Sequence, residues 1–109
     1  MIEVKKDSGI ISVRGHAGYA PHGQDIVCAA VSALVQTMVF SILEINTDEI
    51  QYDMQPGAVE IRYRNLSEKA QTLVDSFFVG IRLIANNYPE NVRVDLLVER
   101  KEDNQKNAH

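Results

Sequence analysis

Hydrophobic and polar residues alternate with a period of two along five short segments of the chain. Such alternation is typical of strands that bury one face of a sheet. Turn-forming residues at 6–9 and again at 55–57 join the first four segments into two β-hairpins. The five predicted strands cover residues 2–6, 10–14, 49–54, 58–64 and 92–98.

Two longer segments lack this alternation and predict helices. Residues 26–43 contain fourteen apolar residues out of eighteen and predict a buried helix. This segment is a little short for a membrane span, is interrupted by polar side chains and lacks basic flanks. Asp25 precedes it and is a good N-cap, because a carboxylate accepts the free backbone N–H groups at the positive helix end. A second helix is expected to begin after Ser67 and to end at 86–89.

The resulting order, ββαββαβ, predicts an α+β fold. We expect a two-layer sandwich in which a largely antiparallel five-stranded sheet carries both helices on one face. The helix at 26–43 is apolar nearly all round, and one sheet covers only one side of it. A second copy of the chain in a symmetric dimer would cover the rest. We expect a single domain over residues 1–99 and a polar, disordered tail over 100–109.

The charge of the 109-residue chain limits the class of partner. Its formal net charge is −4, and residues 1–99 hold thirteen acidic and eight basic side chains. Nucleic-acid binding depends on neutralising phosphates, so we expect none, whereas a cationic peptide remains suitable. The single cysteine excludes an internal disulfide, and the first residues alternate like a strand rather than like a signal peptide. We therefore expect a cytoplasmic protein.

The candidate chemistry lies around the one cysteine, Cys28. It falls in the first turn of the predicted helix, where the helix dipole favours an anionic sulfur. His16, where the second predicted strand meets a Gly-rich loop at 15–24, could act as its general base, with His22 as a rival. The alternatives are that Cys28 is a buried small hydrophobe and that His16 is a surface residue of a mobile loop.

Two further polar residues lie on the same helix stripe as Cys28. Asp25 could orient His16 or only cap the helix, and the two roles are compatible. Ser32, one turn beyond Cys28, could support the thiolate or return its hydroxyl to the backbone. The spacing H-x5-H-x5-C offers three possible zinc ligands but no fourth, and it differs from common ligand pairs, so we expect no metal.

The motif Gly15-His16-Ala17, followed by Asp25-Ile26-Val27-Cys28 and Ser32, resembles the ribosomal-processing cysteine protease family Prp. The resemblance implies a bacterial, homodimeric cysteine endopeptidase, and we expect no cofactor. Its implied substrate is a precursor of large-subunit ribosomal protein number twenty-seven, from which it removes an N-terminal extension by cutting after an aromatic residue.

The same resemblance assigns roles to individual residues. It implies that Cys28 is the catalytic nucleophile and His16 the catalytic base, with Asp25 and Ser32 in support. It also implies that the loop between His16 and Cys28 closes over the substrate; the loop residues we single out are Gly18, Tyr19 and Gly23. The alternative is a non-catalytic ribosome-assembly binding module in which the cysteine is structural.

Overall fold

The computed structural model describes residues 1–45 and 49–96 of the chain. The expected tail at 100–109 and the last two residues of the predicted fifth strand lie outside the described residues. The elements are β1 Ile2–Asp7, β2 Ile10–Arg14, α1 Ile26–Ile45, β3 Glu49–Gln55, β4 Ala58–Arg64, α2 Glu68–Asn87 and β5 Val92–Leu96.

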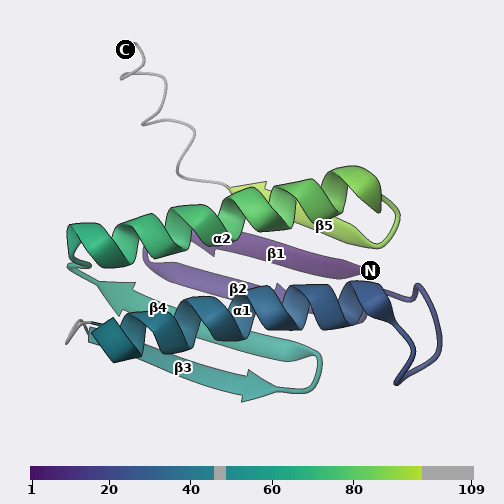
Figure 1. The fold of residues 1–109 in the computed structure, drawn as a ribbon, viewed down its shortest axis with the longest axis horizontal. Helices are drawn as coiled ribbons and strands as arrows, with labels where there is room; N and C mark the ends of the chain where they lie inside the picture. The colour runs from purple at the N-terminus through teal and green to yellow at the C-terminus, as the bar shows by residue number, and fades with distance from the viewer. Residues whose placement is uncertain (46–48, 97–109) are drawn as a thin grey trace, which may run out of the picture.

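The five strands form one mixed sheet in the order β3-β4-β2-β1-β5. Three of the neighbouring pairs are antiparallel, and β1 and β5 are parallel. Figure 1 shows α1 and α2 side by side on the same face of this sheet. The predicted α+β sandwich, with its ββαββαβ order, is therefore confirmed.

The turn of the first hairpin is shorter than the sequence predicted. β1 continues to Asp7, which pairs with Ile10, so only Ser8 and Gly9 form the turn. Both have positive φ, 43° and 84°, as the tight hairpin turn that matches strand twist requires. The prediction began the turn at Lys6, one residue before the last residue of the strand.

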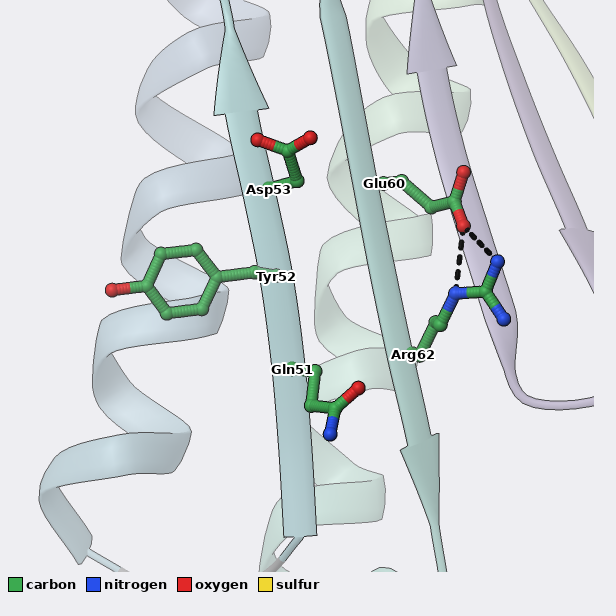
Figure 2. Close-up of a pocket in the computed structure, with 5 residues that line it drawn as sticks. All are labelled: Gln51, Tyr52, Asp53, Glu60 and Arg62. Atoms are coloured by element: carbon green, nitrogen blue, oxygen red, sulfur yellow. Dashed lines mark hydrogen bonds and ion pairs between the residues drawn. The ribbon is translucent and has the colours of Figure 1, made fainter.

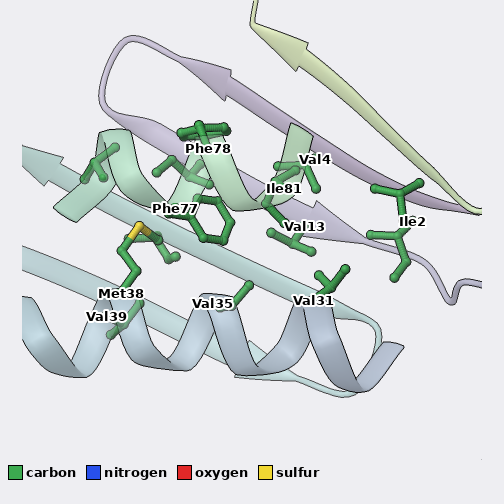
Figure 3. Packing of buried hydrophobic residues seen from close by; sticks show 14 of the residues in the cluster. Ile2, Val4, Val13, Val31, Val35, Met38, Val39, Phe77, Phe78 and Ile81 are labelled. Carbon is green, nitrogen blue, oxygen red and sulfur yellow. The ribbon is translucent and has the colours of Figure 1, made fainter. Parts of the chain in front are cut away.

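The hydrophobic core lies between the helices and the sheet. Figure 3 shows side chains of α1 and α2 meeting those of β1 and β2 there. The two helices approach each other closely at Gly80, where an added Cβ would lie 2.9 Å from Cδ1 of Leu34. By length and hydropathy alone α1 could span a membrane, but here it packs against α2 and contributes to the core. Its buried residues are Val27, Val31, Val35, Met38, Val39 and Ile42.

The opposite face of the sheet is polar and carries no candidate catalytic residue. A hollow on β3 and β4 is lined by Gln51, Tyr52, Asp53, Glu60 and Arg62, and Figure 2 shows the ring of Tyr52 extending to the side on which α1 lies. Arg62 and Glu60 form an ion pair at 2.6 Å. Both side chains are solvent-accessible, so the pair stabilises the fold little.

Candidate active site

Asp25 joins the loop after β2 to the start of α1. Its Oδ1 accepts hydrogen bonds from the backbone N–H groups of Val27 and Cys28, each at 3.0 Å. Its Oδ2 accepts from Tyr19 and Ala20 in the loop, at 3.0 and 3.3 Å. These four donors make Asp25 both the N-cap of α1 and an anchor of the loop. They are the partners of a cap rather than of an imidazole.

These hydrogen bonds also determine the electrostatics of Asp25. The bond from the Cys28 N–H is the largest cause that lowers the pKa of this carboxyl below its ordinary 3.8. Desolvation opposes the shift, and the three other backbone donors add to it. The carboxylate is therefore ionised whenever the protein is near neutral pH.

Cys28 is the third residue of α1, and its side chain is only partly buried. The backbone N–H of Ala17, in the loop, donates a hydrogen bond to its Sγ at 3.3 Å. The thiol is therefore not sealed in the core, although Cys28 packs against the edge of the core cluster.

His16 follows β2 and packs against the β3–β4 turn. A Cβ added to Gly57 in that turn would lie 2.8 Å from Nε2 of His16. The turn is held in place because the N–H of Gly15 donates to the carbonyl oxygen of Gly57 at 2.9 Å. The carbonyl oxygen of His16 itself accepts from the amino group of Met1 at 2.6 Å.

Two adjoining cavities bring the predicted residues together. One has a volume of about 480 Å³ and the other about 350 Å³. Both are lined by Cys28 and His16, and also by His22 and Ser32. Residues that could supply a thiol, two imidazoles and a hydroxyl therefore line the same region at the start of α1.

The loop residues that we singled out are placed differently from one another. Gly18 and Gly23 line the larger cavity together with Asp25. Tyr19 lies outside that lining and is 48% exposed. Its ring packs edge-on against the ring of Tyr88, with 5.5 Å between centroids. Tyr19 thus connects the loop to the end of α2.

The zinc alternative finds no ligand set in the part of the chain that the structure describes. Among residues 1–45 and 49–96, no three side chains of His, Cys, Asp or Glu lie close enough together to hold a metal ion.

The contacts of three residues around the site were not predicted from the sequence, although Ala17 belongs to the motif named there. The Ala17 N–H reaches the sulfur, Asn91 donates from Nδ2 to the carbonyl oxygen of Ala17 at 2.9 Å, and Gly57 packs on His16. Gly57 had a signal only as a turn residue. Asn91 had none, because it lies 74 positions from its partner.

The family model and the curated relatives that match this chain name the same family. A family model described as cysteine protease Prp matches residues 1–93. The ribosomal processing cysteine protease Prp of Bacillus subtilis strain 168 is 34% identical over 100 residues, covering 81% of this chain and 87% of that protein. The protein of the same name from Staphylococcus aureus strain Mu50 is 32% identical over 84 residues, covering 74% and 79%.

Solved structures share the fold. The crystal structure of Prp from S. aureus with a covalently linked product peptide matches with a TM-score of 0.80 at 23% identity, covering 88% of this chain and 97% of that one. A Streptococcus mutans crystal structure matches with a TM-score of 0.67 at 31% identity, covering 88% and 91%. Sequence and fold thus agree over most of the chain, which belongs to the cysteine protease Prp family.

Proposed function

We propose that this chain is a cysteine endopeptidase in which Cys28 is the nucleophile and His16 the general base. The observation that carries the proposal is that both side chains line the same two cavities. The sulfur also lies at the N-terminal end of α1 with a backbone donor on it. Membership of a family of cysteine proteases is consistent with these roles.

In the proposed mechanism, His16 takes the proton from the Cys28 thiol, and the thiolate attacks the scissile carbonyl carbon. The tetrahedral intermediate collapses when His16 returns the proton to the leaving amine, so the peptide C–N bond breaks and an acyl-enzyme remains. Water, deprotonated by His16, then hydrolyses the thioester and regenerates the thiol. No redox step or cofactor is required.

The N–H groups at the start of α1 are the first candidates for donors to the oxyanion of the tetrahedral intermediate. Backbone N–H groups at the beginning of a helix are natural donors to an oxyanion. Here the N–H groups of Val27 and Cys28 already donate to Asp25. We infer that Asp25 uses these two donors to fix the helix start, so they do not bind the oxyanion in this arrangement.

We further propose that the substrate is a precursor of large-subunit ribosomal protein number twenty-seven and that the cut follows an aromatic residue. The smaller cavity supports an aromatic side chain beside the sulfur, because its 350 Å³ is bounded largely by apolar groups. The curated relatives are ribosomal processing proteases, and S. aureus Prp has been crystallised with a substrate peptide. The apolar lining residues are Ile2, Val13, Val31, Val35, Met54 and Val59.

A cytoplasmic homodimer completes the proposal. The outward side of α1 exposes Ile26, Phe40 and Leu43, at 57%, 47% and 40%. Tyr52 on the neighbouring edge strand extends this surface, with its ring edge-on to Phe40 at 5.6 Å. A two-fold axis would pack this exposed stripe of α1, formed by Ile26, Phe40 and Leu43, against the same stripe of a second copy and remove both from water. Ribosomal proteins are made and assembled in the cytoplasm, which gives the proposed location.

The proposed activity is tested with a peptide that spans the N-terminal extension of the ribosomal protein. The parent chain is expected to release a product ending in the aromatic residue. Cys28→Ala is expected to give no detectable cleavage, and Cys28→Ser is expected to be nearly inactive while still binding the peptide. Mass spectrometry of the products, with titration calorimetry for binding, reads both effects. Cleavage by Cys28→Ala at the parent rate would refute the mechanism.

Peptide cleavage, combined with alkylation of the thiol, separates the protease from a binding module. A non-catalytic module would bind the peptide without cutting it, and its structural thiol would resist iodoacetamide until the protein unfolds. The partly exposed Cys28 favours rapid alkylation of the native protein.

A further inference from the structure

The connection between α2 and β5 contacts the loop beside Cys28 at two points. Asn91 donates from its side-chain amide to the carbonyl oxygen of Ala17 at 2.9 Å. Tyr88, at the other end of the same connection, packs its ring against Tyr19. Figure 1 shows the α2–β5 connection and the loop before α1 at the same end of the molecule, where the N-terminus also lies.

Asn91 is held in place by hydrogen bonds of its own main chain. Its backbone N–H donates to the carbonyl oxygen of Tyr88 at 2.9 Å, and its own carbonyl oxygen accepts from Ile2 at 2.8 Å. These two bonds involve only the main chain, so they are available to any residue at this position except proline. The side-chain amide is what this residue adds.

Ala17 is consequently held on both of its sides. Its N–H donates to Sγ of Cys28, and its C=O accepts from Asn91. Ala17 is only 2% exposed, so the Ala17 end of each bond is sheltered from water, although both bonds are part-buried overall. The loop around Ala17 is rich in glycine, which restrains the backbone little, and these two bonds restrain it from both sides.

We propose that Asn91 is a positioning residue for the Cys28 thiolate, acting through Ala17. The amide of Asn91 holds the Ala17 backbone in the orientation that points its N–H at the sulfur. A donor held in that orientation stabilises the charged sulfur more than the neutral thiol, and it costs no reorganisation when the charge forms. Without the amide, the Ala17 segment turns more freely and the sulfur loses part of this stabilisation.

The inference rests on the proposed role of Cys28, but its test needs no peptide substrate. The test measures the rate of alkylation of the native protein by iodoacetamide as a function of pH. Cys28 is the only cysteine in the chain, so the modified mass reports on this thiol alone. The variants are Asn91→Ala, and Asn91→Leu, which keeps the side-chain volume without a donor.

Asn87→Ala is the matched control. Asn87 also donates from Nδ2 to a backbone carbonyl, that of Leu83, at 3.0 Å, but this bond lies within α2 and does not involve the loop. Thermal unfolding of every variant shows whether the fold is retained. The amide resonance of Ala17, followed by NMR, reports directly whether its N–H still faces the sulfur.

Both Asn91 variants are expected to shift the alkylation profile upward by about one pH unit and to slow the reaction about tenfold below the midpoint. The Ala17 amide resonance moves with them, and Asn87→Ala leaves both readouts unchanged. Folded Asn91 variants that react like the parent would overturn the inference. If one Asn91 variant does not fold, the other decides the result by the same criterion.

The outcome also separates this inference from the proposed protease activity. A parent chain that alkylates readily and responds to Asn91 but cuts no peptide refutes the protease and leaves the positioning role in place. A parent chain that cuts the peptide while its Asn91 variants keep the parent's alkylation profile refutes the positioning role alone.

Discussion

Gly57 leaves the space that the imidazole of His16 occupies: an added Cβ would lie 2.8 Å from Nε2 and 3.0 Å from Cε1. Gly57 also has a φ of 74°, which an L side chain adopts at a cost. The glycine therefore serves both the turn of the β3–β4 hairpin and the placement of the proposed general base.

Substitution of this glycine is expected to affect activity beyond its effect on stability. Gly57→Ala should lower the free energy of unfolding by about 1–2 kcal/mol from its backbone conformation. It should also displace His16 and reduce kcat/KM about ten- to a hundredfold, because general-base catalysis depends on placement. Peptide cleavage and denaturant titration measure the two quantities on the same samples.

Gly9→Ala is the control for this variant. Gly9 also has a positive φ, 84°, and an added Cβ would lie 2.7 Å from the carbonyl oxygen of Tyr63, in a hairpin turn remote from His16. It should lose stability and keep kcat/KM. Equal losses of kcat/KM in the two variants would mean that Gly57 acts only through stability.

Substitution can separate the two roles of Asp25, which are to cap α1 and to anchor the loop. Asp25→Asn keeps one oxygen that can cap α1, but its amide group cannot accept from Tyr19 and Ala20. We expect faster hydrogen exchange at those two loop amides while the amides of Val27 and Cys28 stay protected. Asp25→Ala should expose all four amides to exchange and lower the melting temperature further. Unchanged protection of the loop amides in Asp25→Asn would exclude an anchoring role.

Acid should loosen the loop through the same carboxylate. Because the folded pKa of Asp25 lies below its ordinary 3.8, the group stabilises the fold at pH values above 3.8. This contribution is lost as the pH falls through the lower folded value, where the protonated carboxyl is a weaker acceptor. The amide resonances of Tyr19 and Ala20 should therefore titrate below pH 3.8 in the parent. The step should be absent in Asp25→Asn, and its persistence there would assign it to another group.

The exposed stripe of α1 predicts the oligomeric state. The parent should run with the mass of a dimer in light scattering after size exclusion, and Phe40→Glu should run as a monomer because a charge would be buried at the interface. Val79→Glu is the control, since Val79 on α2 is 48% exposed, close to the 47% of Phe40. A monomeric parent at micromolar concentration would contradict the dimer, as would dissociation of both variants to the same extent.

Local patterns predicted the elements of this fold because each depends on neighbours in the chain. Alternation of side chains along β1–β4 fixes which face of each strand is buried. Asp25 before an apolar run predicted the start of α1, and its carboxylate caps that helix. The position of Cys28 in the first turn follows from the same cap. The motif from Gly15 to Ser32 also carried the family resemblance, which the family model matches over residues 1–93.

The tertiary structure alone decided which distant segments meet. No local pattern pairs β1 in parallel with β5, inserts β2 between β1 and β4, or brings Asn91 to Ala17 across 74 positions. Nor does the Pro-Gly turn before Ala58 indicate that its glycine accommodates His16. Such contacts depend on strand order and on how two helices pack over a sheet, and they form only when the whole chain closes on its core. The sequence thus determined the elements and the candidate thiol, and the closed sheet determined what surrounds that thiol.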